Sequence, residues 1–125
     1  KIGLSGADMG TSFHLPRLVG TCNAAALMYT GRFIDAVKAE RIGLVNDAVA
    51  DEEMLEVAQE YIQGMLATAP LGLRLTKEAL NAATDAPSLT ATLAVEDRNQ
   101  VMTLNTPDLT EGLAAFREKR APSWG

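Results

Sequence analysis

Cysteine and histidine are nearly missing from this sequence, which contains one of each, Cys22 and His14. A single thiol cannot form a disulfide within the chain. Zinc clusters usually draw several thiolate or imidazole ligands from spaced pairs, so this composition excludes them. We therefore expect no bound metal and a reducing, cytoplasmic environment.

Long apolar runs and concentrations of basic residues are also absent. No apolar stretch approaches the roughly 20 residues that cross a bilayer, so we expect no membrane segment. The net charge is −5 and the 11 Lys and Arg residues are dispersed, which argues against a nucleic-acid surface. A hydrophobic content of 47% is typical of a soluble globular domain. Because the chain opens with Lys1 inside an apolar stretch, we expect it to belong to a longer polypeptide.

The opening segment, residues 2–12, combines three glycines with one acid. Glycine permits tight turns, so we expect the backbone to turn around Asp8 and to enter a helix near Gly10 or Thr11. Asp8 then has two interpretations. It either satisfies free N–H groups at the helix start, which is the commoner role, or serves in a functional loop.

Short helices alternate with extended segments through the first half of the chain. Small residues predict a helix over residues 21–29 that is ended by Gly31. Asp35 is expected to cap a turn of helix over residues 36–41. Residues 44–49 contain two apolar pairs, which indicate either a buried strand pair or a bend.

Four helices are expected in the second half, each marked at its start by acids or by proline. They cover about residues 54–66, 70–83, 88–104 and 107 onward. This change of pattern predicts two parts, residues 1–67 and 68–125. The helical part is too small to bury all its apolar faces, so we expect it to pack on the first half and on another subunit.

Ordered segments across the whole chain resemble the enoyl-CoA hydratase/isomerase (crotonase) family. Each segment alone is a weak signal, whereas the ordered set is specific. The segments are Ile2-Gly3-Leu4, Gly10-Thr11, residues 15–20, Thr30-Gly31-Arg32, residues 42–46, Ala69-Pro70, residues 75–80 and residues 111–120.

The resemblance implies an α/β protein whose fold is a spiral of ββα turns followed by a helical trimerisation region. Residues 1–67 would form the C-terminal end of the spiral core and residues 68–125 the helical oligomerisation region, so this chain should be mostly helical. The family's oxyanion hole uses two backbone amides, and both are expected upstream of Lys1. The two catalytic glutamates of the hydratases are expected there as well.

Asp8 acquires a specific role from this resemblance. In the dienoyl-CoA isomerases of the family an Asp-hydrophobic-Gly-Thr motif carries an acid/base, and Asp8-Met9-Gly10-Thr11 falls on it, with one more residue after the preceding Gly-Leu. Apolar neighbours such as Met9 and Phe13 would disfavour the charged carboxylate and raise its pKa. Asp8 is therefore the catalytic candidate, with Met9 and Phe13 lining the acyl pocket.

Two residues near the C-terminus are further binding candidates. Without the resemblance, Phe116 is interpreted as an aromatic residue of the core, and Lys119 as a cation that interacts with the dipole at a helix C-terminus. The resemblance implies that Phe116 and Lys119 approach the adenine and phosphates of CoA, often across a subunit boundary, with the charge acting as an anchor.

The sequence thus predicts part of an enzyme that hydrates a trans-2-enoyl-CoA or shifts its double bond. CoA belongs to the substrate, and no other cofactor is implied. The expected partners are an acyl-CoA and further copies of the chain, as a homotrimer or a dimer of trimers, without nucleic acid or membrane. The isolated chain should lack activity. The alternative is a non-catalytic helical assembly module of the same family.

Overall fold

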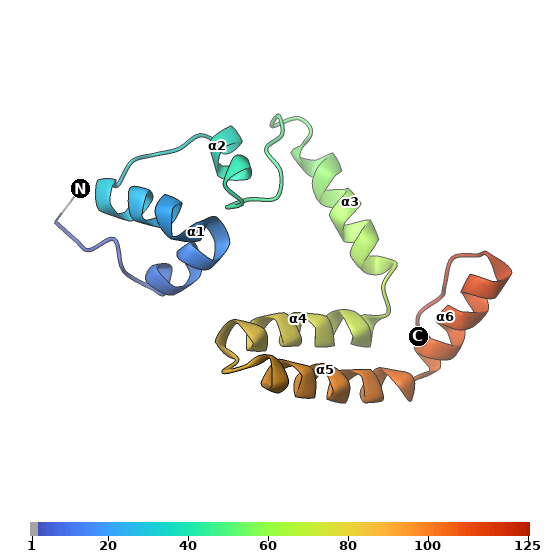
Figure 1. The fold of residues 1–125 in the computed structure, drawn as a ribbon. Coiled ribbons are helices and arrows are strands. Elements are labelled where there is room, and N and C mark those ends of the chain that lie inside the picture. Colours follow the sequence, from blue (N-terminus) through green and yellow to red (C-terminus); the bar gives the residue numbers. More distant parts are fainter. Residues whose placement is uncertain (1–2) are drawn as a thin grey trace. The chain divides into compact units, whose positions relative to one another are not determined.

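The computed structural model describes residues 3–125, and within that range it contains helices and no strand (Figure 1). The chain is therefore mostly helical, as predicted. The helices are α1 (Thr11–Thr30), α2 (Ala36–Arg41), α3 (Met54–Leu66), α4 (Pro70–Asp85), α5 (Leu89–Leu104) and α6 (Pro107–Glu118).

The chain forms two compact units, Lys1–Met54 and Leu55–Gly125, called here the N-terminal and C-terminal units. Helices α1 and α2 belong to the first, and α4, α5 and α6 to the second. The division expected between residues 67 and 68 is a different one, since it separates the family's spiral core from its helical region. That division stays a prediction.

Glycines interrupt and end α1. Gly20 has φ 76° and ψ 156°, so two helical segments meet there. Gly20 thus separates the helix expected to start near Gly10 or Thr11 from the helix expected over residues 21–29. Gly31 adopts the left-handed conformation with φ 56°, and its N–H donates to the carbonyl of Leu27 at 2.8 Å. Gly31 therefore ends α1, as expected, because glycine adopts positive φ without a steric penalty.

Both ends of α2 are set by local chemistry. The Lys38 N–H donates to Asp35 Oδ1 at 2.7 Å, which confirms the predicted cap. At the other end Gly43 has φ 77°, and the Leu44 N–H donates to the Ala39 carbonyl at 2.9 Å. This is the 6→1 hydrogen bond of a Schellman motif, and glycine occupies the left-handed position of that motif.

Residues 44–49 form a bend followed by irregular backbone, so the bend alternative is confirmed and the buried strand pair is wrong. Val45 and Val49 are 43% and 41% exposed. A strand needs a neighbouring strand to satisfy its N–H and C=O groups, and residues 3–125 offer none.

In the C-terminal unit α4 packs on α5, and α5 contacts α6 (Figure 1). Pro70 opens α4, as predicted. Helix α5 is capped by Ser88, whose Oγ accepts the Ala91 N–H at 3.2 Å, a cap that was not predicted from the sequence. Leu75 and Asn99 are buried between α4 and α5, where Asn99 Nδ2 donates to the Leu75 carbonyl at 3.3 Å. This hydrogen bond satisfies a buried amide that would otherwise destabilise the core.

Helix α3 has the expected helical spacing of apolar residues, but none of its residues is buried. The exposed apolar side chains are Met54, Leu55, Ile62, Met65 and Leu66. An amphipathic helix normally buries its apolar side, so this side of α3 lacks cover within the described residues. The partner surface expected from the sequence concerns residues 68–125 and stays a prediction.

Candidate functional site

The backbone of the Asp8 loop starts α1, whereas the Asp8 carboxylate does not cap it. Thr11 donates to the Asp8 carbonyl through its N–H at 2.9 Å and through Oγ1 at 2.6 Å. The N-cap residue is Gly10, which has no side-chain cap. Asp8 Oδ1 instead accepts the N–H of the adjacent Met9 at 2.8 Å, and Asp8 is exposed. The capping interpretation of the side chain is therefore wrong, and the carboxylate is accessible.

Phe13 lies one turn further along α1 and is half-buried. The Arg17 guanidinium carbon lies 3.5 Å from the Phe13 ring centroid, and Arg17 Nη1 donates to the Phe13 carbonyl at 2.9 Å. The His14 ring meets Phe13 edge-on, with centroids 5.1 Å apart. The Arg17 cation thus covers one face of the Phe13 ring.

Met9, in contrast, is 95% exposed. Within the described residues Met9 does not enclose the Asp8 carboxylate.

Among the described residues, the non-glycine residues with positive φ are Met9 at 49° and Lys119 at 53°. Both are predicted substrate-binding residues. The left-handed conformation costs an L-residue roughly 1–2 kcal/mol. Such strain tends to persist where the position of the side chain matters for function.

Lys119 occupies a position that usually holds glycine. The Arg120 N–H donates to the Ala115 carbonyl at 3.1 Å and the Lys119 N–H to the Phe116 carbonyl at 3.3 Å, which together form a Schellman motif. The same motif at the end of α2 uses Gly43. At the end of α6 a lysine therefore occupies the left-handed position that glycine occupies at the end of α2.

Phe116 is 84% exposed on α6. Its interpretation as a core aromatic is wrong, because the buried residue of this helix is the small Ala115. An exposed aromatic ring one turn before a lysine can stack on a flat ring and place a cation near an anion. The CoA contacts expected of Phe116 and Lys119 stay a prediction.

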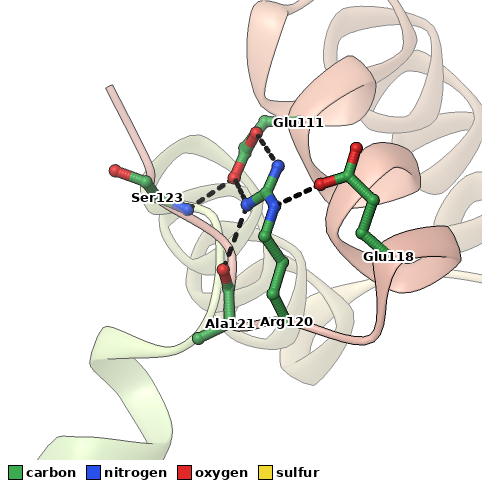
Figure 2. A network of polar contacts seen from close by, with 5 residues as sticks. All are labelled: Glu111, Glu118, Arg120, Ala121 and Ser123. Carbon is green, nitrogen blue, oxygen red and sulfur yellow. Dashed lines mark hydrogen bonds and ion pairs between the residues drawn. The ribbon is translucent and has the colours of Figure 1, made fainter.

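A cluster of polar groups, here called the Glu111 cluster, joins α6 to the residues that follow it (Figure 2). Arg120 Nη1 and Nη2 donate to Glu111 Oε1 and Oε2 at 2.6 and 3.0 Å, and Arg120 Nε donates to Glu118 Oε2 at 2.6 Å. The Ser123 N–H donates to Glu111 Oε1 at 2.7 Å. The bidentate geometry and the backbone donor fold the chain back along α6.

These contacts change the protonation of the cluster. Hydrogen bonds from Arg120, and then from the Ser123 N–H, lower the pKa of Glu111 from 4.5 to about 2. Hydrogen bonds to Glu111 and then Glu118 raise the pKa of Arg120. Because the pKa of Glu111 is lower in the folded chain, its stabilising contribution is complete above pH 4.5 and is lost as the pH falls through about 2.

A cavity of about 660 Å³ lies along α4, α5 and α6. Leu75, Asn99, Leu113 and Trp124 are among the residues that line it. The Trp124 Nε1 atom is buried and has no hydrogen-bond partner within the described part of the chain. A Cβ atom added to Gly112 would lie 3.4 Å from Trp124 Cη2, so the indole lies directly against α6.

The structure keeps the predicted site residues in two local groups. Asp8, Met9 and Phe13 lie around the start of α1, and Phe116 and Lys119 lie at the end of α6. Neither of the α6 residues lines the cavity. Sequence reasoning missed the pairing of Glu111 with Arg120. Its only signal in the sequence was an acid before the end of α6 and a base after it.

No helix between residues 3 and 125 is both long and apolar enough to cross a membrane. Within the same range, no group of three or more His, Cys, Asp or Glu residues is arranged to hold a metal ion.

The sequence is similar to known proteins over nearly its whole length. The sequence model of the enoyl-CoA hydratase/isomerase family matches residues 1–125. The probable enoyl-CoA hydratase EchA12 of Mycobacterium tuberculosis is 39% identical over 121 residues, which cover 96% of this chain and 42% of that protein. The probable mitochondrial enoyl-CoA hydratase 2 of Arabidopsis thaliana is 40% identical over 113 residues, covering 90% of this chain and 37% of that protein.

Solved structures show the same relationship. A probable enoyl-CoA hydratase/isomerase from Mycobacterium abscessus matches with a TM-score of 0.92 and 37% identity, over 98% of this chain and 47% of that one. Enoyl-CoA hydratase from Bacillus anthracis matches with a TM-score of 0.88 and 36% identity, over 92% of this chain and 44% of that one. These matches confirm the predicted crotonase fold class.

The chain spans less than half the length of these relatives, between 37% and 47% in the four cases. The family match nevertheless extends from the first residue of this chain to the last. This chain belongs to the enoyl-CoA hydratase/isomerase family.

Proposed function

We propose that the protein carrying this chain acts on acyl-CoA thioesters, adding water to a trans-2-enoyl-CoA or shifting its double bond. The observation that carries this proposal is the family match over residues 1–125. The enoyl-CoA hydratase names of its relatives in M. tuberculosis and A. thaliana support it. CoA takes part as a portion of the substrate, and the reaction needs no metal or redox cofactor.

Both reactions require polarisation of the thioester carbonyl and movement of a proton at the α or γ carbon. The oxyanion-hole amides and catalytic glutamates of the family are expected in segments that this chain does not contain. The contribution of this chain is then one rim of the acyl pocket, formed by Asp8, Met9 and Phe13. The exposed Asp8 carboxylate accepts the N–H of Met9 at 2.8 Å and keeps further lone pairs for a proton.

At the other local group, Lys119 anchors the CoA phosphates and Phe116 stacks on the adenine. The exposed ring of Phe116 supports this assignment. The left-handed backbone of Lys119 supports it as well, because glycine would fill that position with less strain.

Replacing Lys119 with glycine is expected to change stability and binding in opposite directions. Removing the side chain relieves the left-handed strain and should stabilise the chain by up to about 1 kcal/mol in urea unfolding. Loss of the cation should weaken CoA-thioester binding several-fold in calorimetric titrations of an active polypeptide that contains the chain.

Two controls separate these effects. Lys119→Gln keeps the backbone strain and removes the charge, so it should weaken binding without stabilising the chain. Gly43→Ala places a side chain at the corresponding position of α2, where φ is 77°, and should destabilise by about 1 kcal/mol. Unchanged binding in both Lys119 variants would remove Lys119 from the CoA site.

The protein is further proposed to work in the cytoplasm as a homotrimer or a dimer of trimers. The uncovered apolar side of α3 supports assembly, since exposed apolar patches commonly mark interaction surfaces. The same observation favours the second candidate function, a non-catalytic assembly module. In that case a polypeptide containing the chain would oligomerise but would not turn over enoyl-CoA.

Activity separates the two candidates. Hydration of crotonyl-CoA, followed by loss of the enoyl-thioester absorbance, is expected for a longer polypeptide that supplies the oxyanion hole and the glutamates. The 125-residue chain alone should show no turnover above the uncatalysed rate. Robust turnover by this chain alone would contradict the assignment of those groups to other segments.

A further inference from the structure

The residues that follow α6 return along the helix instead of leaving it. Lys119 reverses the backbone through the Schellman motif, and the next residue, Arg120, reaches Glu111 with both terminal nitrogens. Three residues later the Ser123 N–H donates to the same carboxylate at 2.7 Å (Figure 2). Glu111 therefore holds this segment, residues 119–125, at two separate points.

The second of these points lies next to the chain's single tryptophan. Trp124 follows Ser123 directly, and its six-membered ring lies against Gly112, the neighbour of Glu111 on α6. A Cβ atom added at position 112 would lie 3.4 Å from Trp124 Cη2, which is ordinary van der Waals distance, so the indole packs closely on α6 at this point. Trp124 also lines the cavity along α4, α5 and α6, so the position of the tail determines one wall of that cavity.

We propose that residues 119–125 form a strap that Glu111 holds against α6, so that Trp124 closes one side of the cavity along α4, α5 and α6. Glu111 is the positioning residue, since it holds the strap at Arg120 and at Ser123, the residue directly before the indole. When the strap is released, Trp124 leaves α6 and the cavity widens.

The strength of the strap follows from its geometry. Bidentate arginine–carboxylate pairs and backbone donors to a carboxylate are charge-assisted hydrogen bonds. The Arg120 and Glu111 side chains are 40% and 23% exposed, so solvent partly screens them. Glu118 adds an exposed second acceptor for Arg120. We expect removal of the Glu111 charge to shift the equilibrium toward the released strap about fivefold.

The indole N–H of Trp124 reports directly on the strap. The indole nitrogen is buried in the closed state. The indole proton should therefore exchange slowly with solvent, and acrylamide should quench the Trp124 fluorescence poorly. Glu111→Gln should accelerate indole exchange about fivefold and increase quenching, with unchanged helical circular dichroism. Glu78→Gln is the matched control, because it removes an exposed acid from the 4.0 Å pair with Arg74 on α4.

A second pair of variants tests the strap without changing charge. Ser123→Pro removes the N–H that Glu111 accepts and should release Trp124, whereas Ser123→Ala keeps that N–H and should behave as the parent chain. If Glu111→Gln loses its helices, the comparison of Ser123→Pro with Ser123→Ala tests the strap in its place. The proposal is overturned if both releasing variants leave the indole protected, or if Glu78→Gln exposes the indole as much as Glu111→Gln.

Discussion

Replacing Asp8 with asparagine is expected to lower the turnover of enoyl-CoA by about 10²–10⁴-fold, the usual effect of losing a general acid/base. The substitution removes the titrating group but keeps an oxygen that can accept the Met9 N–H. Loop geometry and substrate binding should therefore persist while turnover falls. The measurements are kcat and KM for hydration and for double-bond isomerisation, in an active polypeptide that contains this chain.

The control for this prediction is Asp51→Asn, which removes another exposed acid of the N-terminal unit. It should leave both reactions unchanged. A structural role for Asp8 would lower the stability of the variant, whereas a chemical role removes one limb of the pH–rate profile. Full hydration and isomerisation rates in Asp8→Asn would exclude Asp8 from the mechanism, leaving proton transfer to the upstream glutamates expected from the family.

Truncating Leu75 to alanine is expected to destabilise the C-terminal unit by about 2–3 kcal/mol. Leu75 is 4% exposed between α4 and α5, and its carbonyl accepts the hydrogen bond from Asn99. Removing buried methyl groups loses their transfer free energy and enlarges a void. Leu75 already lines the cavity, so we expect a cost in the lower half of the range for such substitutions.

Leu80→Ala provides the matched comparison, since it makes the same chemical change in the same helix. Leu80 is 67% exposed, so its truncation should alter the free energy of unfolding by no more than about 0.5 kcal/mol. Urea unfolding followed by circular dichroism measures both variants. Equal destabilisation by the two substitutions would show that Leu75 does not belong to the core of the unit.

The candidate site could be predicted only in part. Family motifs suggested Asp8, Met9, Phe13, Phe116 and Lys119, and the roles of these five residues stay predictions. The positive φ of Met9 and of Lys119 could not be read from the sequence, since neither residue type favours it. The exposure of Phe116 was also missed, because an aromatic at helical spacing more often faces a core.

The amino-acid sequence by itself determined where the helices begin and end. Asp35 and Ser88 each accept the N–H group three residues further along, Pro70 opens α4, and Gly31 and Gly43 adopt positive φ. Each of these effects acts within one helical turn. For that reason single residues were sufficient to predict the cap at Asp35, the start of α4 at Pro70 and the end of α1 at Gly31.

Tertiary structure alone decided what those helices bury and how the chain ends. Asn99 is buried because α4 supplies a carbonyl 24 positions away, and Trp124 lies against Gly112 because Glu111 binds both Arg120 and Ser123. Of the two alternatives for residues 44–49, the strand pair failed for the same reason, because no neighbouring strand pairs with it in residues 3–125. Burial, pairing and the lowered pKa of Glu111 all depend on groups that meet only when the chain folds back.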